Sequence, residues 1–475
     1  MKNILLITID SLRASQLAAS NQTAPAHILH LANRGVCFTQ AFATGPRTAE
    51  SFPAILASTY PISFGGTWRL PPDLVSIAQV LASAGLATAA FHSNPYLSAN
   101  LGYDRGFQVF WDSSQKTPIT TRLGARFMAH LHQEAPIYRL LRRFARQFES
   151  SLGLAHYVRA QPVTSMAVRW LQNQPRPFFL WLHYMDLHYP YAPPPRLLQQ
   201  VRTGGLSRTI QADLMVRSLE NPASITPAEK GMLLDLYLAA LLSVDEQVGR
   251  LLEALSNLQI LHDTFIILTS DHGEEFQEHG QFGHAGQVHA LSAGQPRIRL
   301  YDELLHVPLI FHGPGLQPHK SDQLVSLIDL PPTIIDLLGI SPVSPPDITH
   351  NQPLDWQGLS LKPLLLGDQR VLRRQVFAEY AVRDQAVHYP VIACRTKDWK
   401  YIHDGVHSQH HLYHLVSDPA EHHNLYQPDH PALPPLQDAV NQHLELARNT
   451  PYPLSTQAKL DPLLLERMRS LGYME

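Results

Sequence analysis

Two apolar segments, far apart in the sequence, end in residues of the types that bind metal ions. Residues 3–9 are followed by Asp10, and residues 264–270 are followed by Asp271 and His272. Because both segments are almost continuously apolar, each is typical of a central strand that is buried on both faces. Ligands of open α/β sheets bind outside the carboxyl ends of such strands. The fold can therefore gather two carboxylates and an imidazole at one edge, and we expect a cation between them.

A further candidate for chemistry is a threonine in the connection after the second expected strand. Residues 44–53 read Thr-Gly-Pro-Arg-Thr-Ala-Glu-Ser-Phe-Pro, which places Thr48 and Ser51 near the start of a helix. A hydroxyl in this position usually caps the helix, and the sequence alone favours Thr48 or Ser51 as an N-cap over Thr48 as a nucleophile. The alternative is that the helix N-terminus holds an anionic ester beside the metal, where coordination deprotonates a hydroxyl that attacks phosphorus or sulfur.

The elements that must position these residues alternate between strand and helix patterns. Further strands are expected at residues 38–43, 87–91, 178–182 and 307–311. Helices are expected at residues 23–34, 51–57, 74–84, 229–258 and 330–338. This alternation predicts an α/β fold with a large central, mostly parallel mixed sheet flanked by helices.

The pattern changes to short strands near the carboxyl end of the chain, at residues 376–380, 391–395, 399–403 and 411–415. Such closely spaced strands indicate a smaller antiparallel α+β subdomain. We therefore expect a catalytic domain at residues 1–365, interrupted by an insertion at about 115–163, and a C-terminal subdomain at residues 366–475. Residues 137–146 of the insertion have the pattern of a basic amphipathic helix, for which packing on the body is favoured over a lid or a membrane-surface contact.

The composition limits the classes of function. The chain has 475 residues, of which 44% are hydrophobic and 16% charged, and its net charge of −3 provides no basic field for a nucleic-acid partner. Two cysteines, Cys37 and Cys394, are too few for a disulfide framework, and Cys37 lies in an apolar setting typical of a buried thiol. No apolar run has the length of a transmembrane segment and no signal peptide is visible, so we expect a cytoplasmic location. The sequence leaves the oligomeric state open.

Seven stretches in a particular order carry more information than any one of them. They are residues 7–13 (ITIDSLR), 102–107 (GYDRGF), 183–191 (HYMDLHYPY), 270–276 (SDHGEEF), 300–310 (LYDELLHVPLI), 399–402 (WKYI) and 412–425 (LYHLVSDPAEHHNL). In this combination the chain resembles the sulfatase family, within the alkaline phosphatase superfamily. The resemblance covers nearly the whole chain except the insertion.

The resemblance implies a metal site and a nucleophile. The metal ligands are implied at Asp10, Asp271 and His272, and the nucleophile, which also contacts the metal, is implied at Thr48. One divalent cation, Ca, Mg, Mn or Zn, is the economical expectation. The implied activity is metal-dependent hydrolysis of a small-molecule sulfuric or phosphoric ester.

The resemblance also implies histidines that contact the substrate. His188, in the loop that contains Pro and Tyr, is implied to contact the ester oxygens or the leaving group. His284 is the best match for a basic residue that touches the anion, and His279 is a weaker match. A second cation held by His188, His279 or His284 is left open.

Three departures from the family pattern bear on the chemistry. Typical sulfatases carry Cys or Ser in a Cys-x-Pro-Ser-Arg motif and convert it to formylglycine, whereas this chain has Thr48, with Phe52 in place of the arginine. Because threonine cannot become formylglycine, the site favours phosphate esters more than the family name does. Ser11 stands where many sulfatases have another metal-binding acid. The alternatives are a phosphodiesterase or phospho-group transferase, and a catalytically inactive metal-binding homologue.

Two other polar residues near the expected strand ends receive structural interpretations. Asp186 is expected to cap or orient its loop, and Asn94 is expected to be a turn residue.

Overall fold

The structure is a computed structural model that describes residues 1–18, 24–66, 69–112, 157–173, 177–284, 299–342, 354–384, 387–405 and 408–448. Most of the expected insertion, including residues 137–146, lies outside these residues.

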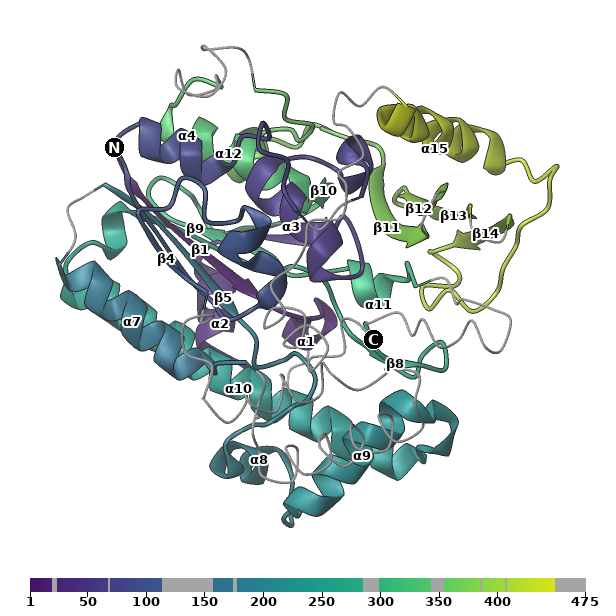
Figure 1. The fold of residues 1–475 in the computed structure, drawn as a ribbon, viewed down its shortest axis with the longest axis horizontal. Helices are drawn as coiled ribbons and strands as arrows, with labels where there is room; N and C mark the ends of the chain where they lie inside the picture. Colours follow the sequence, from purple (N-terminus) through teal and green to yellow (C-terminus); the bar gives the residue numbers. More distant parts are fainter. Residues whose placement is uncertain are drawn as a thin grey trace, which may run out of the picture.

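A mixed sheet of eight described strands forms the centre of the molecule, in the order β10-β2-β9-β6-β1-β5-β3-β4 (Figure 1). The strands are β1 (Asn3–Ile9), β2 (Val36–Phe42), β3 (Ala87–Phe91), β4 (Val109–Trp111), β5 (Phe178–Tyr184), β6 (Thr264–Ser270), β9 (Leu309–His312) and β10 (His319–Ser326). Among these strands β9 alone runs antiparallel to its neighbours, β2 and β6. All residues of β1, β5 and β6 are buried, as expected for the middle of a sheet covered on both faces.

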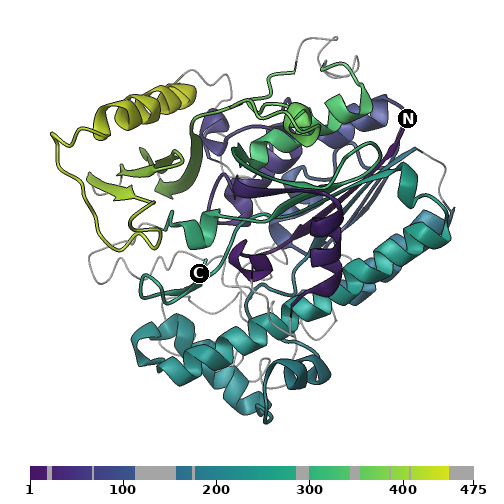
Figure 2. The ribbon, with the colours of Figure 1, turned by 180° about the vertical axis from the view of Figure 1, so that it is seen from behind.

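Helices cover both faces of this sheet. On one face lie α2 (Ala26–Arg34), α7 (Ala160–Asn173) and α10 (Pro227–Asn257), and Figure 2 shows the long teal helix α10 from behind. On the other face lie α3 (Thr48–Ala57), α4 (Ile77–Ser83) and α12 (Leu330–Leu338). Successive side chains of β1 alternate between the two apolar cores that result. Among the described helices, none has the length and apolar content needed to cross a membrane.

Shorter elements complete the main body. They are α1 (Ser15–Ala18), α8 (Pro195–Val201), α9 (Arg208–Glu220), α11 (Asp302–Leu305), α14 (Lys362–Leu365) and the two-stranded sheet of β7 (Glu275–Phe276) and β8 (Phe282–Gly283).

A second, antiparallel sheet follows the main body in the chain. Its strands are β11 (Val376–Asp384), β12 (Val387–Arg395), β13 (Trp399–Asp404) and β14 (Gln409–His414), and α15 (Leu433–Arg448) packs beside them (Figure 1). The expected fold class is thus confirmed, while the boundary at residues 365 and 366 stays a prediction.

The sequence did not indicate every element. It missed β4, β10, α7, α9 and α15. In β10 the first five residues, His-Lys-Ser-Asp-Gln, are polar, because this strand lies at the edge of the sheet and is only partly buried. An edge strand lacks the continuous apolar pattern by which β1 and β6 were found.

A buried ionic cluster joins the C-terminal sheet to the main body. The ammonium of Lys400, on β13, is fully buried and lies 2.7 Å from Asp302 Oδ1, on α11, and 2.8 Å from Glu421 Oε1. Arg395 Nε, on β12, donates a hydrogen bond to Asp302 Oδ2 at 3.1 Å. Such a cluster is sensitive to the loss of one member, since the remaining charges stay buried without compensation.

Lys400→Met is therefore expected to lower the free energy of unfolding by roughly 3–5 kcal/mol, because it leaves the carboxylates of Asp302 and Glu421 facing each other. The matched control is Lys397→Met, which removes the exposed ion pair with Asp322 and should change the stability far less, because solvent screens this pair. Urea unfolding of both variants measures the difference, and equal losses would contradict this account of the cluster.

Candidate functional site

Strand register brings the predicted acids together at the carboxyl edge of the main sheet. β1 pairs with β6 so that Ile9 lies opposite Ser270, and the residues that follow are Asp10 and Asp271. On the other side of β1, β5 places His183 opposite Thr8. The site is therefore built around the end of β1, with its two neighbouring strands on either side.

Two connections complete this edge of the sheet. The loop after β2 leads to Thr48, the first residue of α3, and the loop after β3 carries Asn94. Six residues from these five segments are fully buried: Asp10, Thr48, Asn94, His183, Asp271 and His272.

The distances between these groups are short enough for a shared ligand. His183 Nε2 lies 3.3 Å from Asp10 Oδ2, and His272 Nε2 lies 3.8 Å from Asp10 Oδ1 and 3.4 Å from Asp271 Oδ2. Ligand atoms of Asp10, His183 and Asp271 all lie within 4.8 Å of one another, as do those of Asp10, His272 and His284. Four of the six predicted site residues, Asp10, Asp271, His272 and His284, thus belong to these two groups.

The hydroxyl of Thr48 belongs to the same cluster. It donates a hydrogen bond to Asp271 Oδ2 at 3.1 Å and accepts one from Asn94 Nδ2 at 3.2 Å. Asn94 Nδ2 also lies within hydrogen-bonding distance of Asp10 Oδ2, at 3.2 Å. Asn94 thus contacts the Asp10 carboxylate directly and the Asp271 carboxylate through the Thr48 hydroxyl.

The donor set fits a divalent cation. His272 Nδ1 lies 2.9 Å from the carbonyl of Gly273, so the ring donates there and Nε2 carries its lone pair toward the two carboxylates. Among the described residues, the buried Nε2 atoms of His183 and His272 have no hydrogen-bond partner. Nitrogen lone pairs and carboxylates that face one another without a donor between them are the groups that a metal ion would satisfy.

Electrostatics supports the same conclusion. Burial and the nearby charge of Asp10 raise the pKa of Asp271 well above its ordinary value. Burial also acts to raise the pKa of Asp10, but the neighbouring imidazoles of His188, His183 and His272 outweigh burial and lower it. Two carboxylates in so enclosed a space are not both stable as anions unless a cation compensates them.

His188 and His284 lie beside the cluster. Their rings are 4.9 Å apart between centroids, and the ring of His284 is 4.2 Å from that of His272. Burial lowers the pKa of His188 to about 4 and that of His284 well below its ordinary value. His279 instead stacks on Tyr301 and lies 3.6 Å from Glu303, so the geometry favours His284 as the second histidine.

The interpretation of the α3 N-cap needs correction, and that of Asn94 needs extension. The N-cap of α3 is Arg47, so the N-cap interpretation of Thr48 and Ser51 is wrong, and the Ser51 hydroxyl donates to the Gly45 carbonyl instead. Asn94 does cap a turn, since its Oδ1 accepts from the Tyr96 amide, but its Nδ2 also reaches the cluster, which the sequence did not indicate.

His183 is the residue that sequence reasoning missed. Its signal was a single polar aromatic residue near the end of the apolar strand β5. The neighbouring strand β1 had already ended in an acid, and parallel strands end at the same edge of a sheet. Only the strand order shows that β5 is the direct neighbour of β1.

The expected orienting role of Asp186 is confirmed. Its Oδ2 accepts a hydrogen bond of 2.7 Å from the amide of Ala160, the first residue of α7. This contact ties the loop that carries His188 to the helix that covers β5.

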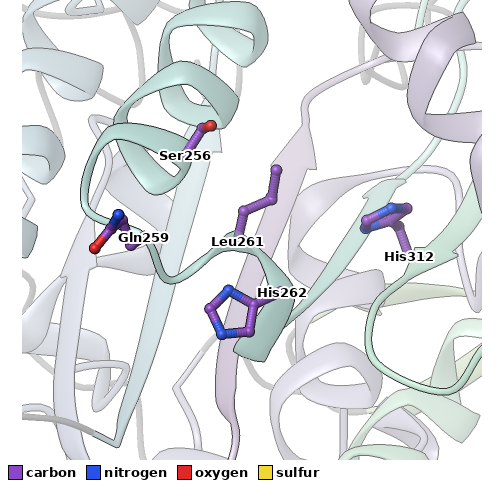
Figure 3. A pocket seen from close by; sticks show the side chains of 5 residues that line it. All are labelled: Ser256, Gln259, Leu261, His262 and His312. Carbon is purple, nitrogen blue, oxygen red and sulfur yellow. The ribbon is translucent and has the colours of Figure 1, made fainter.

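The hollow in Figure 3 lies at the opposite edge of the sheet and is lined by Ser256, Gln259, Leu261, His262 and His312. Leu261 and His262 precede β6, and His312 ends the antiparallel strand β9. These residues include no carboxylate, and the hollow does not belong to the cluster.

Comparison with known proteins identifies relatives along the whole described body. The model of the sulfatase family matches residues 2–340, and that of the N-sulphoglucosamine sulphohydrolase C-terminal region matches residues 297–450. Arylsulfatase K of Gallus gallus is 26% identical over 464 residues, which cover 88% of this chain and 78% of the relative. Choline-sulfatase of Rhizobium meliloti is 32% identical over 190 residues, which cover 40% of this chain and 32% of the relative.

Solved structures share the fold over almost their full length. A protein in complex with its substrate D-glucosamine-2-N,6-O-disulfate has a TM-score of 0.70 at 18% identity, covering 95% of this chain and 99% of that chain. The phosphonate monoester hydrolase of Agrobacterium radiobacter has a TM-score of 0.68 at 21% identity, covering 94% of this chain and 96% of that chain.

The contact of Asp186 with α7 predicts a pH dependence of stability. Burial raises the pKa of Asp186 to about 7, against about 3.9 in an unfolded chain. The folded state therefore binds more protons between these values, so the free energy of unfolding falls as the pH rises from about 4 to about 7. Asp186→Asn cannot titrate and keeps an oxygen for the Ala160 amide, so it should be more stable than wild type at pH 8 and similar to it near pH 4.

Urea unfolding at pH 4.5, 6 and 8 measures this contribution. Asp322→Asn is the matched control, because Asp322 is exposed and burial does not act on it in this way. If the stability difference between Asp186→Asn and wild type were constant over this range, the proposed titration would be refuted.

Proposed function

The chain belongs to the sulfatase family, and from that premise we propose that it hydrolyses a small-molecule phosphoric or sulfuric ester with a divalent metal ion and with Thr48 as the nucleophile. The observation that carries this proposal is the hydroxyl of Thr48. It lies at the first residue of α3, fully buried, and donates to a carboxylate of the cluster, Asp271, at 3.1 Å.

Asp10, Asp271, His272 and Thr48 would hold the cation, because their oxygen and nitrogen atoms converge. When bound, a divalent cation neutralises charge on the ester oxygens and lowers the pKa of an attached hydroxyl. The chain itself supplies the nucleophile, the groups that orient it and the groups that assist the leaving alcohol.

The first turn of α3 would orient the ester. The first amide N–H groups of a helix have no carbonyl partner within the helix, and they favour an anion at that end. Since Thr48 is the first residue of α3, an ester bound at this end would place its phosphorus or sulfur close to the hydroxyl. Asn94, which donates to the same hydroxyl at 3.2 Å, would keep its lone pairs directed toward the substrate.

The reaction then needs two displacements. In the first, the Thr48 hydroxyl releases its proton to water, Oγ1 bonds to phosphorus or sulfur, the bond to the alcohol oxygen breaks, and the leaving oxygen takes up a proton from water beside His188 or His284. In the second, water attacks the same atom and restores the threonine hydroxyl. Both histidines lie beside the cluster, with their rings 4.9 Å apart.

A phosphoric ester suits this nucleophile better than a sulfuric ester. A formylglycine hydrate can expel sulfate because it has a second hydroxyl on the same carbon, and Thr48 has one hydroxyl only. The ester formed on Thr48 must therefore be cleaved by water at phosphorus or sulfur. Serine and threonine phosphate esters are ordinary intermediates of phospho-transfer, and on this ground we place phosphoric esters first.

Thr48→Ala is expected to lower kcat/KM by on the order of 10³-fold or more, because it removes the attacking atom. Thr48→Ser keeps the hydroxyl and should retain much of the activity. Ser51→Ala is the matched control on the same helix, since its hydroxyl bonds only the Gly45 carbonyl among the contacts described. The assay uses aryl phosphate, phosphodiester, phosphonate and sulfate substrates with added Mn²⁺, Mg²⁺, Ca²⁺ or Zn²⁺.

The outcomes of this panel separate the alternatives. Undiminished turnover by Thr48→Ala would refute the nucleophile. Product formed only in the presence of an acceptor alcohol would indicate a transferase. A wild-type protein that binds metal yet turns over none of the substrates would indicate an inactive homologue.

Metal removal gives a test that does not depend on the substrate. Chelation should lower the Tm of the wild-type protein, because a ligand at 100 times its Kd stabilises the folded state by about 2.7 kcal/mol. Asp10→Asn should show a much smaller metal-dependent shift, since it removes one of the two carboxylates at the centre of the cluster. Thermal unfolding with and without each metal measures this, and a wild-type Tm that no divalent cation changes would argue against the metal site.

A further inference from the structure

We propose that His183 is an additional ligand of the cation, and that the pair His183 and His272 makes the site select a transition metal such as Zn²⁺ over Ca²⁺. The inference rests on the proposed function, because it concerns the cation of the same site. It adds a ligand from β5 to the set from β1, β6 and α3.

The first argument is the position of the two imidazoles around Asp10. His183 approaches from β5 and His272 from the end of β6, on the two sides of β1. His183 Nε2 lies 3.3 Å from Asp10 Oδ2, whereas His272 Nε2 lies 3.8 Å from Oδ1. The ligand atoms of His183, Asp10 and Asp271 lie within 4.8 Å of one another, as ligands of a single ion must.

The second argument is the tautomer of His183. Its Nδ1 lies 3.0 Å from the hydroxyl of Thr8, which itself donates to the Leu182 carbonyl at 3.1 Å and accepts from Trp181 Nε1 at 3.0 Å. That hydroxyl has a single hydrogen, and when it donates this hydrogen to Leu182 the ring donates from Nδ1. A neutral ring then carries a lone pair at Nε2, which faces the carboxylate of Asp10.

A lone pair that faces a carboxylate at 3.3 Å is repulsive unless a positive charge lies between them. A metal ion removes this repulsion, and the arrangement of a ring held at Nδ1 and open at Nε2 is the usual state of a metal-binding histidine. The competing explanation is a protonated ring that forms an ion pair with Asp10.

The third argument is the packing of apolar rings around His183, which fixes the orientation of the imidazole. Phe52 packs edge-on against His183, with centroids 5.0 Å apart and an interplanar angle of 85°. Phe52 in turn packs against Trp181, and all three residues are fully buried. This packing keeps Nε2 on the side of Asp10, where the ligand atoms of the cluster lie.

The ligand chemistry gives the selectivity. Ca²⁺ takes six to eight oxygen ligands, whereas imidazole nitrogen suits Zn²⁺ and other transition metals. With His183 included, the set contains two imidazole nitrogens, two carboxylates and the Thr48 hydroxyl, and imidazole and carboxylate are among the ligands of zinc sites. Without His183, oxygen ligands predominate and the preference for Zn²⁺ over Ca²⁺ should weaken.

The test measures metal binding to the full-length protein, without any substrate. Equilibrium dialysis with Zn²⁺ and with Ca²⁺, and the visible absorption spectrum of the Co²⁺-loaded protein, are compared for wild type, His183→Gln and Thr8→Val. The matched control is His92→Gln, because His92 is also fully buried and lies 5.1 Å from Trp181 between ring centroids, but does not belong to the metal-ligand groups.

His183→Gln is expected to raise the Kd for Zn²⁺ at least tenfold, to change the Kd for Ca²⁺ much less, and to alter the Co²⁺ spectrum. Thr8→Val keeps the imidazole but removes its anchor, so it should weaken Zn²⁺ binding in the same direction and to a smaller extent. His92→Gln should bind both metals as wild type does. Circular dichroism identifies any variant that does not fold, and Thr8→Val then carries the test if His183→Gln fails.

Unchanged Zn²⁺ affinity and an unchanged Co²⁺ spectrum in His183→Gln would overturn the proposal and make His183 the ion-pair partner of Asp10. An equal loss of Zn²⁺ and Ca²⁺ affinity would also overturn it, because it would show a general structural role. If instead the proposed function were wrong, the wild-type protein itself would bind no divalent cation, which is a different result.

Discussion

The contact between Asp10 and Asp271 is the constraint on which the site depends. Parallel pairing of β1 with β6 puts both residues at the same edge, and complete burial removes the water that would screen their repulsion. The raised pKa of Asp271 expresses the cost of this arrangement. A cation would lower that cost, and in the proposed site the surrounding hydroxyl and imidazoles would be the remaining ligands. The fold thus holds charges together in a way that favours metal binding over an empty site.

The C-terminal sheet supports two loops of the site, the connection from β2 to α3 and the loop after β6. The amide of Glu379, on β11, donates to the carbonyl of Thr44 at 2.8 Å, in the connection that leads to α3. The loop after β6 is fixed through Gly273, whose amide donates to the Leu304 carbonyl of α11 at 2.7 Å. A side chain at Gly273 would clash with that helix, because a Cβ there would lie 2.0 Å from a backbone oxygen of α11. Since α11 is itself held by Lys400, the second sheet acts as a brace for the first.

The departures of this chain from the usual sulfatase motif are connected in space. Thr48 replaces the residue that becomes formylglycine, and Phe52, one turn later on α3, packs against His183. With Phe52 in this position, the side chain that packs on His183 is apolar, whereas the arginine of the usual motif would bring a positive charge. In the proposed mechanism, Thr48 would supply a metal-assisted hydroxyl in place of the aldehyde chemistry, and Phe52 lies next to the proposed ligand His183.

Local sequence determined the strands β1 and β6, the alternation with helices, and the types of residue at the strand ends, because continuous apolar runs and their polar ends are visible within short windows. Asp10, Asp271 and His272 could be found in this way, and the family resemblance added Thr48, His188 and His284. Strand order and register decided the rest. They made β5 the neighbour of β1, which brought His183 to Asp10, and they directed Asn94 toward the hydroxyl of Thr48. These two contacts join residues 46 and 173 positions apart, so no short window contains them, and only the packing of the whole sheet brings them into one enclosed space.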